Sequence, residues 1–465
     1  MAFTTKVSES FGRVIEASSF GIADPVVKCR YVSKGNNLII GRSNTDLSAQ
    51  RLIYMGKVLE SCPSTNMLAG DVWLDVGFPH VIYISGTRGS GKSFDLGVLI
   101  EGISDLDKPT PIQQEVAPIT TILLDTQNQF WTLKYEPNEE IPEHKSQLED
   151  LKEWRISPNR LSNIELFTPR GYPKLLGDET EFSIRPRDVD LSEWCALLGQ
   201  EIYSPQGHVL RSALGRLNHS DFSITDLLTD IRTDSNWIGI ADSTRNAVAY
   251  KLEDYEHSGL FDPNGLQVVD LLKEGRCNVF MLRELSDGDK SLVTAIVAKS
   301  LFRSMGEFHS RKKLAKFRGE QLNGAQLPGR VWLLIDEAHV VAGKDTESPA
   351  RNALVEFVKR GRDAGLSLVL ATQQPSAVDD RILSQINLSI NHRLTFQSDV
   401  NAAISRIPTK IVSSMRTGGA TITDFGDMLR YLDSGDCFIG DQCTSRTILI
   451  KIRPRVTAHG GYSPT

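Results

Sequence analysis

The sequence predicts an α/β fold with a mainly parallel sheet, because short apolar runs alternate with longer segments of helical periodicity. One apolar run leads through a glycine-rich loop into a helical pattern, and another ends in two carboxylates. Polar loops and amphipathic helical patterns interrupt the alternation in the middle of the chain, and β-rich fragments precede it. We therefore expect a parallel-sheet core, a helical insertion and a small N-terminal β module.

Composition describes an ordinary globular protein. Of 465 residues, 40% are hydrophobic and 24% are charged, which excludes a disordered or fibrous chain. The apolar stretches are no longer than strands, and the N-terminus has no apolar signal region, so we expect a cytoplasmic protein without membrane contact. Six cysteines lack C-x-x-C spacing, which favours reduced packing thiols.

The first 70 residues contain the fragments that predict the β module. Phe11–Ile15, Val26–Val32 and Leu38–Ile40 are separated by turn residues. The core is expected to begin at residue 71 and to continue to residue 130, with strands over Val81–Ile84 and Ile119–Leu124.

The most informative motif has the pattern G-x-x-x-x-G-K-S, between the Val81–Ile84 strand and a helix expected over Phe94–Ile103. It consists of Gly86, Thr87, Arg88, Gly89, Ser90, Gly91, Lys92 and Ser93. Backbone amides of such a loop converge on the phosphates of a nucleoside triphosphate. Lys92 would reach the β and γ phosphates, and the Ser93 hydroxyl would ligate Mg²⁺.

Residues 131–272 are expected to form the helical insertion, since apolar residues such as Val209, Leu210 and Ala213 follow a helical spacing. The apolar run Arg276–Leu282 returns to the core, whose second part is placed at 273–455. A helix is expected to start at the Ser286 cap.

A second half of the nucleotide site is predicted where the run Val331–Ile335 ends in Asp336 and Glu337. Asp336 would hold the Mg²⁺ shell through water, and Glu337 would polarise the attacking water as general base. The alternative is a strand that merely ends in an acidic turn. The next apolar run ends at Gln373, whose amide could sense the γ-phosphate or the lytic water, or could be an ordinary polar strand terminus.

The succession of these motifs resembles the HerA branch of the HerA/FtsK family. The resemblance rests on four runs: Asp336-Glu337-Ala338-His339, Gly361-Arg362-Asp363-Ala364-Gly365-Leu366, Ala371-Thr372-Gln373-Gln374-Pro375-Ser376 and Ile382-Leu383-Ser384-Gln385-Ile386-Asn387. It implies a RecA-like P-loop ATPase core that uses ATP and Mg²⁺ at the interfaces of a homo-oligomeric ring, most often a hexamer.

The resemblance also implies roles for single residues. Lys92, Ser93, Asp336 and Glu337 correspond to the half-site of one subunit, and Gln373 to the sensor. Arg362 stands where the family has an arginine that reaches the neighbouring subunit's γ-phosphate. Arg360 is the competing candidate, and the alternative is that Lys359, Arg360 and Arg362 are the solvated face of a helix.

The sequence departs from the family pattern at several positions. Arg88 replaces a small residue, Gln374 stands where arginine is frequent, and Gln129 stands where an acid is common, so Asp125 is only weakly implicated. The N-terminal module resembles the family's β-barrel only at Gly12-Arg13-Val14.

In this family ATP hydrolysis drives double-stranded DNA through the ring. A net charge of −6 is compatible with a local basic channel, and the segment Arg311–Arg318 is a candidate contact; the alternative is a solvated helix end. No helix-turn-helix or zinc-finger spacing indicates base-specific reading.

The C-terminal part is expected to form a hairpin from Asp436–Asp441 and Thr447–Ile452. From Arg453 onward, including the tail at 456–465, we expect a segment that lies against a neighbour or remains loose.

Two functions compete. The first is a ring-forming DNA translocase or helicase that works with a partner nuclease or effector in DNA processing or anti-phage defence. The second is a nucleotide-regulated scaffold that assembles and activates a nuclease or an NAD-degrading effector without pumping DNA. A conjugation or secretion ATPase is a weaker third hypothesis, because the chain shows no membrane segment.

Overall fold

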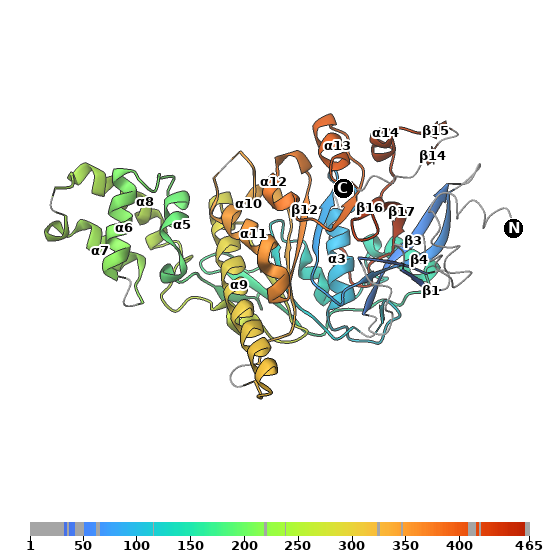
Figure 1. Ribbon diagram of the computed structural model, residues 1–465, viewed down its shortest axis with the longest axis horizontal. Coiled ribbons are helices and arrows are strands. Elements are labelled where there is room, and N and C mark those ends of the chain that lie inside the picture. The colour runs from blue at the N-terminus through green and yellow to red at the C-terminus, as the bar shows by residue number, and fades with distance from the viewer. Residues whose placement is uncertain are drawn as a thin grey trace.

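A computed structural model describes residues 32–34, 37–41, 51–61, 66–114, 116–217, 221–237, 239–322, 326–345, 347–407, 415–417 and 420–460. One large mixed sheet runs through the molecule, with helices on both faces (Figure 1). The predicted α/β fold with a mainly parallel sheet is confirmed.

The sheet contains fifteen strands in the order β1-β2-β4-β3-β17-β16-β13-β5-β12-β11-β7-β10-β8-β9, with β6 beside β3. The eight strands from β13 to β9 are parallel to one another. The strands are β1 (Val32–Lys34), β2 (Asn37–Ile40), β3 (Leu52–Ser61), β4 (Asn66–Asp75), β5 (Val81–Ser85), β6 (Gln113–Gln114), β7 (Thr120–Asp125), β8 (Ile164–Pro169), β9 (Thr180–Phe182), β10 (Cys277–Met281), β11 (Val331–Ile335), β12 (Leu366–Thr372), β13 (Leu388–Asn391), β16 (Asp436–Asp441) and β17 (Arg446–Ile452). β14 (Met415–Thr417) and β15 (Ala420–Ile422) form a separate pair.

The helices divide between the two faces of this sheet and the insertion. They are α3 (Lys92–Ile103), α4 (Lys145–Glu153), α5 (Leu191–Leu197), α6 (Pro205–Leu217), α7 (Ile224–Arg232), α8 (Asp242–Glu256), α9 (Asp287–Arg318), α10 (Ala338–Val341), α11 (Pro349–Arg360), α12 (Asp380–Leu383), α13 (Gln397–Ile404) and α14 (Phe425–Arg430).

Both faces of the central strands are buried, as the apolar runs in the sequence predict. Along β11, Leu333 and Ile335 join the core that contains α9 and α11, whereas Trp332 and Leu334 join the core that contains α3. Because alternate side chains of a strand point to opposite faces, a continuous apolar run serves both layers.

Strand register brings the carboxyl ends of five strands to one edge of the sheet. Ser85 of β5 pairs with Thr372 of β12, Leu370 pairs with Ile335 of β11, and Met281 of β10 pairs with Asp125 of β7. Loops that follow these strands therefore lie together, and we call this the carboxyl edge.

The N-terminal strands extend the same sheet. β3 pairs with β17 and with β4, and β4 crosses the expected boundary at residue 70. The expected strand over Phe11–Ile15, which includes Gly12-Arg13-Val14, lies outside the described residues, and of the one over Val26–Val32 only the last residue is described.

The interval 131–272 is not helical throughout. Its β8 pairs with β10 in the parallel part of the sheet, and β9 follows beside it. The helices α5 to α8 form a lobe at the far left of Figure 1, drawn in green. β8 has only six residues and lies between polar segments, so its short apolar run does not predict a strand from the sequence.

The expectation of a loose C-terminal segment is wrong for residues 453–458. Arg453 and Arg455 are fully buried, and Arg453 Nη1 lies 2.7 Å from Glu101 Oε2 on α3. The same carboxylate accepts hydrogen bonds from the backbone amides of Val456 and Thr457. Burial opposes ionisation, but the two arginines hold the pKa of Glu101 below its usual value, so a buried ionic network anchors this segment.

Cys195, Cys277 and Cys437 are buried and unpaired, and Cys443 is also a free thiol. Among the described helices, none is both long and apolar enough to cross a membrane.

Candidate nucleotide-binding site

The glycine-rich loop lies between β5 and α3, as the motif predicts. Neighbouring side chains pack closely against two glycines of this loop. A Cβ added to Gly86 would come within 2.3 Å of Ser90 Oγ, and a Cβ added to Gly91, whose φ is 127°, would come within 3.0 Å of the His392 ring. Ser90 Oγ donates to the Thr87 carbonyl at 2.8 Å, and the Thr87 amide donates to the Arg393 carbonyl at 2.9 Å. A side chain at Gly91 would be strained by the positive φ, and one at Gly86 would have to displace the side chains of Ser90 and His392.

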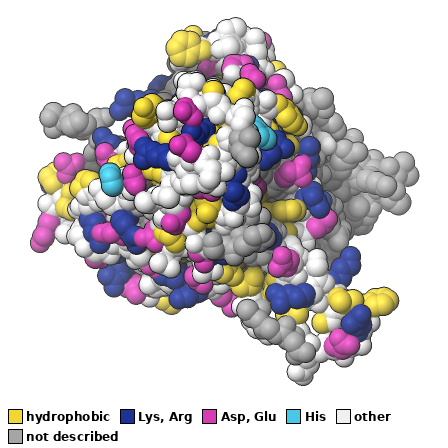
Figure 2. All heavy atoms as spheres, turned by 90° about the vertical axis from the view of Figure 1, so that its left-hand side faces the viewer, with side chains coloured by type: hydrophobic (Ala, Val, Ile, Leu, Met, Phe, Trp, Pro, Cys, Tyr) yellow, Lys and Arg dark blue, Asp and Glu magenta, His cyan; other side chains and the backbone are white. Residues whose placement is uncertain are grey.

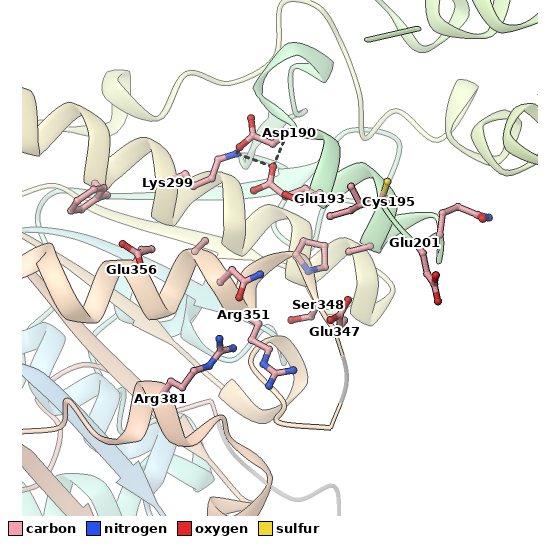
Figure 3. A pocket seen from close by; sticks show the side chains of 18 of the residues that line it. Asp190, Glu193, Cys195, Glu201, Lys299, Glu347, Ser348, Arg351, Glu356 and Arg381 are labelled. Carbon is pink, nitrogen blue, oxygen red and sulfur yellow. Dashed lines mark hydrogen bonds and ion pairs between the residues drawn. The ribbon is translucent and has the colours of Figure 1, made fainter. Parts of the chain in front are cut away.

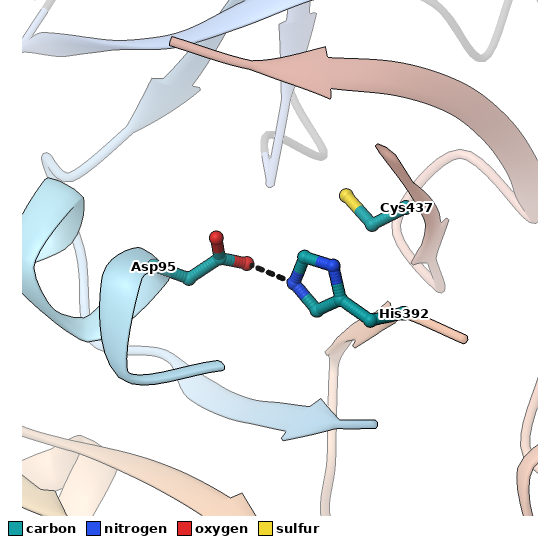
Figure 4. Close-up of side chains that lie close together, drawn as sticks. All are labelled: Asp95, His392 and Cys437. Carbon is teal, nitrogen blue, oxygen red and sulfur yellow. Dashed lines mark hydrogen bonds and ion pairs between the residues drawn. The ribbon is translucent and has the colours of Figure 1, made fainter. Parts of the chain in front are cut away.

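A buried histidine supports the loop (Figure 4). His392 Nδ1 lies 3.0 Å from the Asp436 carbonyl oxygen, which can only accept, so Nδ1 carries a proton. Nε2 lies 2.8 Å from Asp95 Oδ2 in the first turn of α3. Neither residue is predicted from the sequence, where the one local signal is that the apolar run of β13 ends in the polar residues Asn391, His392 and Arg393.

Asp95, His392 and Cys437 have the side-chain types of a metal site, and their ligand atoms lie within 4.8 Å of one another. However, both ring nitrogens of His392 already have protein partners. Burial also raises the pKa of the Cys437 thiol well above its usual value. The cluster is thus a hydrogen-bonded support for the loop.

Lys92 is almost fully buried, and its Nζ donates to the Thr87 carbonyl at 2.9 Å. Burial lowers the pKa of Lys92, while the charges of Glu337, Asp336 and Asp95 oppose this shift. The lysine from the loop and the two acids after β11 therefore share one electrostatic environment.

Asp336 is completely buried, and neither of its carboxylate oxygens has a hydrogen-bond partner among the described residues. Burial, followed by the nearby charges of Asp125 and Glu337, raises its pKa well above the usual value. An unpartnered buried carboxylate is unfavourable unless a cation or bound water satisfies it. The donor set of Asp336 and the half-buried Ser93 hydroxyl fits Mg²⁺, which prefers oxygen ligands.

Asp125, only weakly implicated by the sequence, lies beside Asp336 at the end of β7. Its two oxygens accept the amides of Phe130 at 2.8 Å and Gln127 at 3.1 Å. Burial raises its pKa to about 6 despite these hydrogen bonds. Asp125 thus orders the following turn and adds negative potential behind Asp336.

Glu337 adopts the left-handed conformation, with φ 51°, at the start of α10. Its carboxylate accepts hydrogen bonds from the side-chain amide and the backbone amide of Gln373. His339 Nδ1 lies 3.4 Å from Glu337 Oε2 and 3.1 Å from Thr372 Oγ1. Because β12 lies between β5 and β11, Gln373 is placed between the phosphate loop and the acids.

Three further sequence-predicted residues have side chains that do not contact Lys92, Asp336 or Glu337. Arg88 is exposed in the loop. Arg362 is exposed in the turn before β12, so it lies at the opposite edge of the sheet from Gln373. Arg360 is also exposed, pairs with Glu356 at 3.7 Å and stacks over Phe302.

A cleft of about 760 Å³ lies between α5, α9 and α11 (Figure 3). Its charges are already matched within the chain. Lys299 pairs with Asp190 and Glu193, while Arg351 and Arg381 both pair with Asp379. Lys299, Arg351 and Arg381 are therefore not free to pair with an anionic ligand in the cleft.

Comparison with known proteins identifies relatives of the region that holds the phosphate loop. Residues 72–301 match the family model described as Helicase HerA, central domain. The DNA double-strand break repair helicases HerA of Sulfolobus acidocaldarius and Sulfurisphaera tokodaii are each 26% identical over 211 residues. These alignments cover 45% of this chain and 38% of each relative, so the chain aligns with well under half of their length. The structure of VirB4 of Thermoanaerobacter pseudethanolicus aligns with 88% of this chain and 97% of its own at 13% identity, with a TM-score of 0.48.

Proposed function

Because residues 72–301 match the central domain of helicase HerA, we propose that the chain is a HerA-like P-loop ATPase that binds ATP with Mg²⁺ and hydrolyses it at the carboxyl edge of the sheet. One observation carries the proposal. A buried lysine from the glycine-rich loop, an unpartnered buried carboxylate and a second carboxylate held by an amide converge where the strand ends meet. Phosphoryl transfer needs these groups and little covalent chemistry from the protein.

We assign the roles as follows. Backbone amides from Gly86 to Ser93 cradle the phosphates, and Lys92 neutralises the β and γ phosphates. Asp336 and Ser93 hold Mg²⁺, which supplies charge neutralisation on the phosphate oxygens when bound. Glu337 takes a proton from the attacking water as the water oxygen bonds to the γ-phosphorus. The bond to the bridging oxygen breaks, leaving ADP and phosphate.

Gln373 would position both Glu337 and the lytic water. Its side-chain amide donates to the Glu337 carboxylate. When the γ-phosphate binds, the lytic water can take the place of this amide beside the carboxylate and accept a hydrogen bond from the amide. His339 contacts the same carboxylate from the other side.

We further propose that the active form is a homo-oligomeric ring, with a hexamer as the expected state. An arginine that supplements an ATP site must approach the γ-phosphate. Arg362 is exposed at the edge of its own sheet that is remote from the phosphate loop, which makes it available only to a neighbouring subunit.

The substrate we propose is double-stranded DNA, moved by ATP turnover, with a separately encoded nuclease or effector as partner in DNA processing or anti-phage defence. The support is the similarity to proteins named DNA double-strand break repair helicase HerA. A cytoplasmic location is part of the same proposal.

The test is the ATPase rate of the purified chain with and without linear double-stranded DNA, together with the mass of the assembly. Lys92→Ala and Glu337→Gln serve as the inactive variants. We expect DNA-stimulated turnover in a ring, lost in both variants. Turnover that is indifferent to DNA would contradict translocation.

The helical lobe favours a second candidate, a nucleotide-gated scaffold for an effector such as a nuclease or an NAD-degrading enzyme. The lobe of α5 to α8 lies at the side of the body (Figure 1), and its buried residues Leu210, Leu227 and Leu252 continue the core that contains α9 and α11. Such a lobe offers a platform for a partner. A ring that still activates its effector with Glu337→Gln would favour this function over pumping.

A further inference from the structure

The helix α9 continues well beyond the body of the protein. It has 32 residues, about 48 Å of helix, and its last buried side chain is Phe308. His309 Nε2 contacts the Gly329 carbonyl, just before β11, so the helix leaves the body at the edge opposite the nucleotide site. Residues 310–318, which we call the α9 tip, contain no buried side chain and project below the body in Figure 1.

The α9 tip is strongly basic. It carries five cations, Arg311, Lys312, Lys313, Lys316 and Arg318, and none of them has an ion pair among the residues that the structure describes. Lys312 and Lys316 are spaced i and i+4, which places like charges side by side and destabilises a helix. Protein helices owe most of their stability to packing, which the tip lacks.

The helix dipole accounts for only part of this charge. Cations in the last turn favour a helix C-terminus, and here Lys316 and Arg318 occupy that turn before the left-handed Gly319 cap. The dipole effect falls off within one turn. Arg311, Lys312 and Lys313 lie further in, so they indicate an external anion.

The arrangement of the cations fits a nucleic-acid backbone. At about 100° per residue, the five cations cover an arc of about 220°, and Leu314 and Phe317 share the remainder. Phe317 is 90% exposed. Figure 2 shows basic and hydrophobic side chains together on the projection at its lower right. A helix that lies on a membrane needs a broad apolar face, whereas a helix between phosphate strands meets anions on more than one side.

The other end of α9 is tied to the nucleotide site. Ser291 Oγ accepts the Ala350 amide at 3.0 Å and lies 3.5 Å from the Val341 carbonyl, in the short helix α10 that starts directly after Glu337. A single continuous helix thus joins the elements after Glu337 to the exposed tip.

We propose that the α9 tip is a contact surface for the phosphate backbone of double-stranded DNA. The proposal rests on the DNA-directed function above and names the residues that would carry it. The contact is independent of base sequence, because Lys and Arg on phosphates position a duplex without reading it.

The test is a fluorescence-anisotropy titration of full-length protein with a labelled blunt duplex, in Mg²⁺ and a non-hydrolysable ATP analogue, over a series of salt concentrations. The tip variant is Lys313→Gln/Lys316→Gln. The matched control is Lys145→Gln/Lys152→Gln, which removes two exposed lysines from α4. Each lost phosphate contact lowers the salt slope by about 0.9, so we expect a slope smaller by about 2 and roughly tenfold weaker binding at 0.1 M salt in the tip variant only.

Three results would overturn the proposal in distinguishable ways. Wild-type protein that does not bind DNA would remove the proposed DNA function itself. If wild type binds DNA and the tip variant binds it equally well, only the tip assignment is wrong. The same holds if the α4 control variant loses as much DNA binding as the tip variant. A tip variant that loses binding to phosphatidylserine vesicles but still binds DNA like wild type would assign the tip to a membrane surface.

Discussion

His392 Nε2 lies 2.8 Å from Asp95 Oδ2, directly beneath the phosphate loop. The two residues are 297 positions apart in the chain, and both are buried. Since His392 also holds the Asp436 carbonyl, the pair ties α3, the end of β13 and β16 to the loop that would meet the phosphates.

We predict that Asp95→Ala weakens nucleotide binding roughly tenfold, because His392 loses the partner that fixes its ring under Gly91. Asp95→Asn should remain within about threefold of wild type, since an amide N–H can donate to Nε2 while Nδ1 still donates to Asp436. Titration with a fluorescent ATP analogue measures both. Equal affinity in Asp95→Ala and Asp95→Asn would show that the loop does not depend on this pair.

Asp336→Asn should stabilise the nucleotide-free protein while it removes Mg²⁺ dependence. The wild-type carboxylate is buried without a hydrogen-bond partner among the described residues, so removing its charge is expected to raise the free energy of unfolding by about 1–2 kcal/mol. Thermal unfolding without nucleotide measures the first effect, and nucleotide titration with Mg²⁺ or EDTA the second. Asp363→Asn, an exposed acid at the other edge, is the control. A destabilised Asp336→Asn that still responds to Mg²⁺ would argue against this assignment.

Glu337→Gln should lower kcat by about 10²- to 10⁴-fold with little change in ATP affinity, because the proposed general base is lost and the phosphate loop is intact. Gln373→Ala should lower kcat about 10- to 100-fold, since Glu337 loses its hydrogen-bonded amide. Gln374→Ala removes the neighbouring exposed amide and should be nearly neutral. If Gln374→Ala lowers kcat as much as Gln373→Ala does, the sensor assignment is wrong.

The parts of this site that could be predicted are those encoded locally. The glycine-rich loop and the acids after β11 each lie within a few residues of a buried apolar run, so one segment of sequence contains the whole signal. The position of Gln373 between them depends on β12 entering the sheet between β5 and β11, and this order is set by packing across the whole core.

Long-range pairs explain what the sequence could not show. His392 and Asp95 look like unrelated polar residues until β13 and α3 are brought together. Arg453 and Arg455 suggest a solvated tail, because nothing near them in sequence indicates that Glu101 on a buried helix would neutralise them. Charged residues are almost never buried unless they are paired, and the partner here is about 350 positions away.

Acid should destabilise the fold through His80. Its Nε2 donates to the Asp75 carbonyl and its Nδ1 accepts from Asn387, so the buried ring is neutral. Burial lowers the pKa of His80 to about 4 from the usual 6.5. The unfolded chain therefore takes up a proton first, and stability that is complete above pH 6.5 is lost as pH falls toward 4, by about 3 kcal/mol in total.

Urea unfolding between pH 7.5 and 4.5 measures this loss. His80→Gln should flatten the pH dependence by up to one proton, and the exposed His208→Gln should not. An unchanged slope in His80→Gln would rule out His80 as its source.

Arg362 should act across a subunit interface. It precedes β12, whose seven residues place Gln373 about 20 Å away at the other edge, too far for Arg362 to reach the phosphates of its own chain. Arg362→Ala should lower kcat about 10³-fold or more while ATP binding persists, as expected for an arginine that stabilises the transition state. Arg360→Ala should have little effect, because the Arg360 side chain is engaged by Glu356 and Phe302.

Mixing subunits separates action across an interface from action within one chain. Arg362→Ala and Glu337→Gln subunits are each expected to be inactive alone. In a mixed ring, some interfaces combine an intact Glu337 from one subunit with an intact Arg362 from its neighbour, so turnover should reappear in proportion to such interfaces. Because each chain carries only one lesion, an arginine that served its own site could not produce this recovery. As a control, energy transfer between labelled chains measures whether the two variants exchange subunits. Exchange without recovered turnover would show that Arg362 does not act in trans.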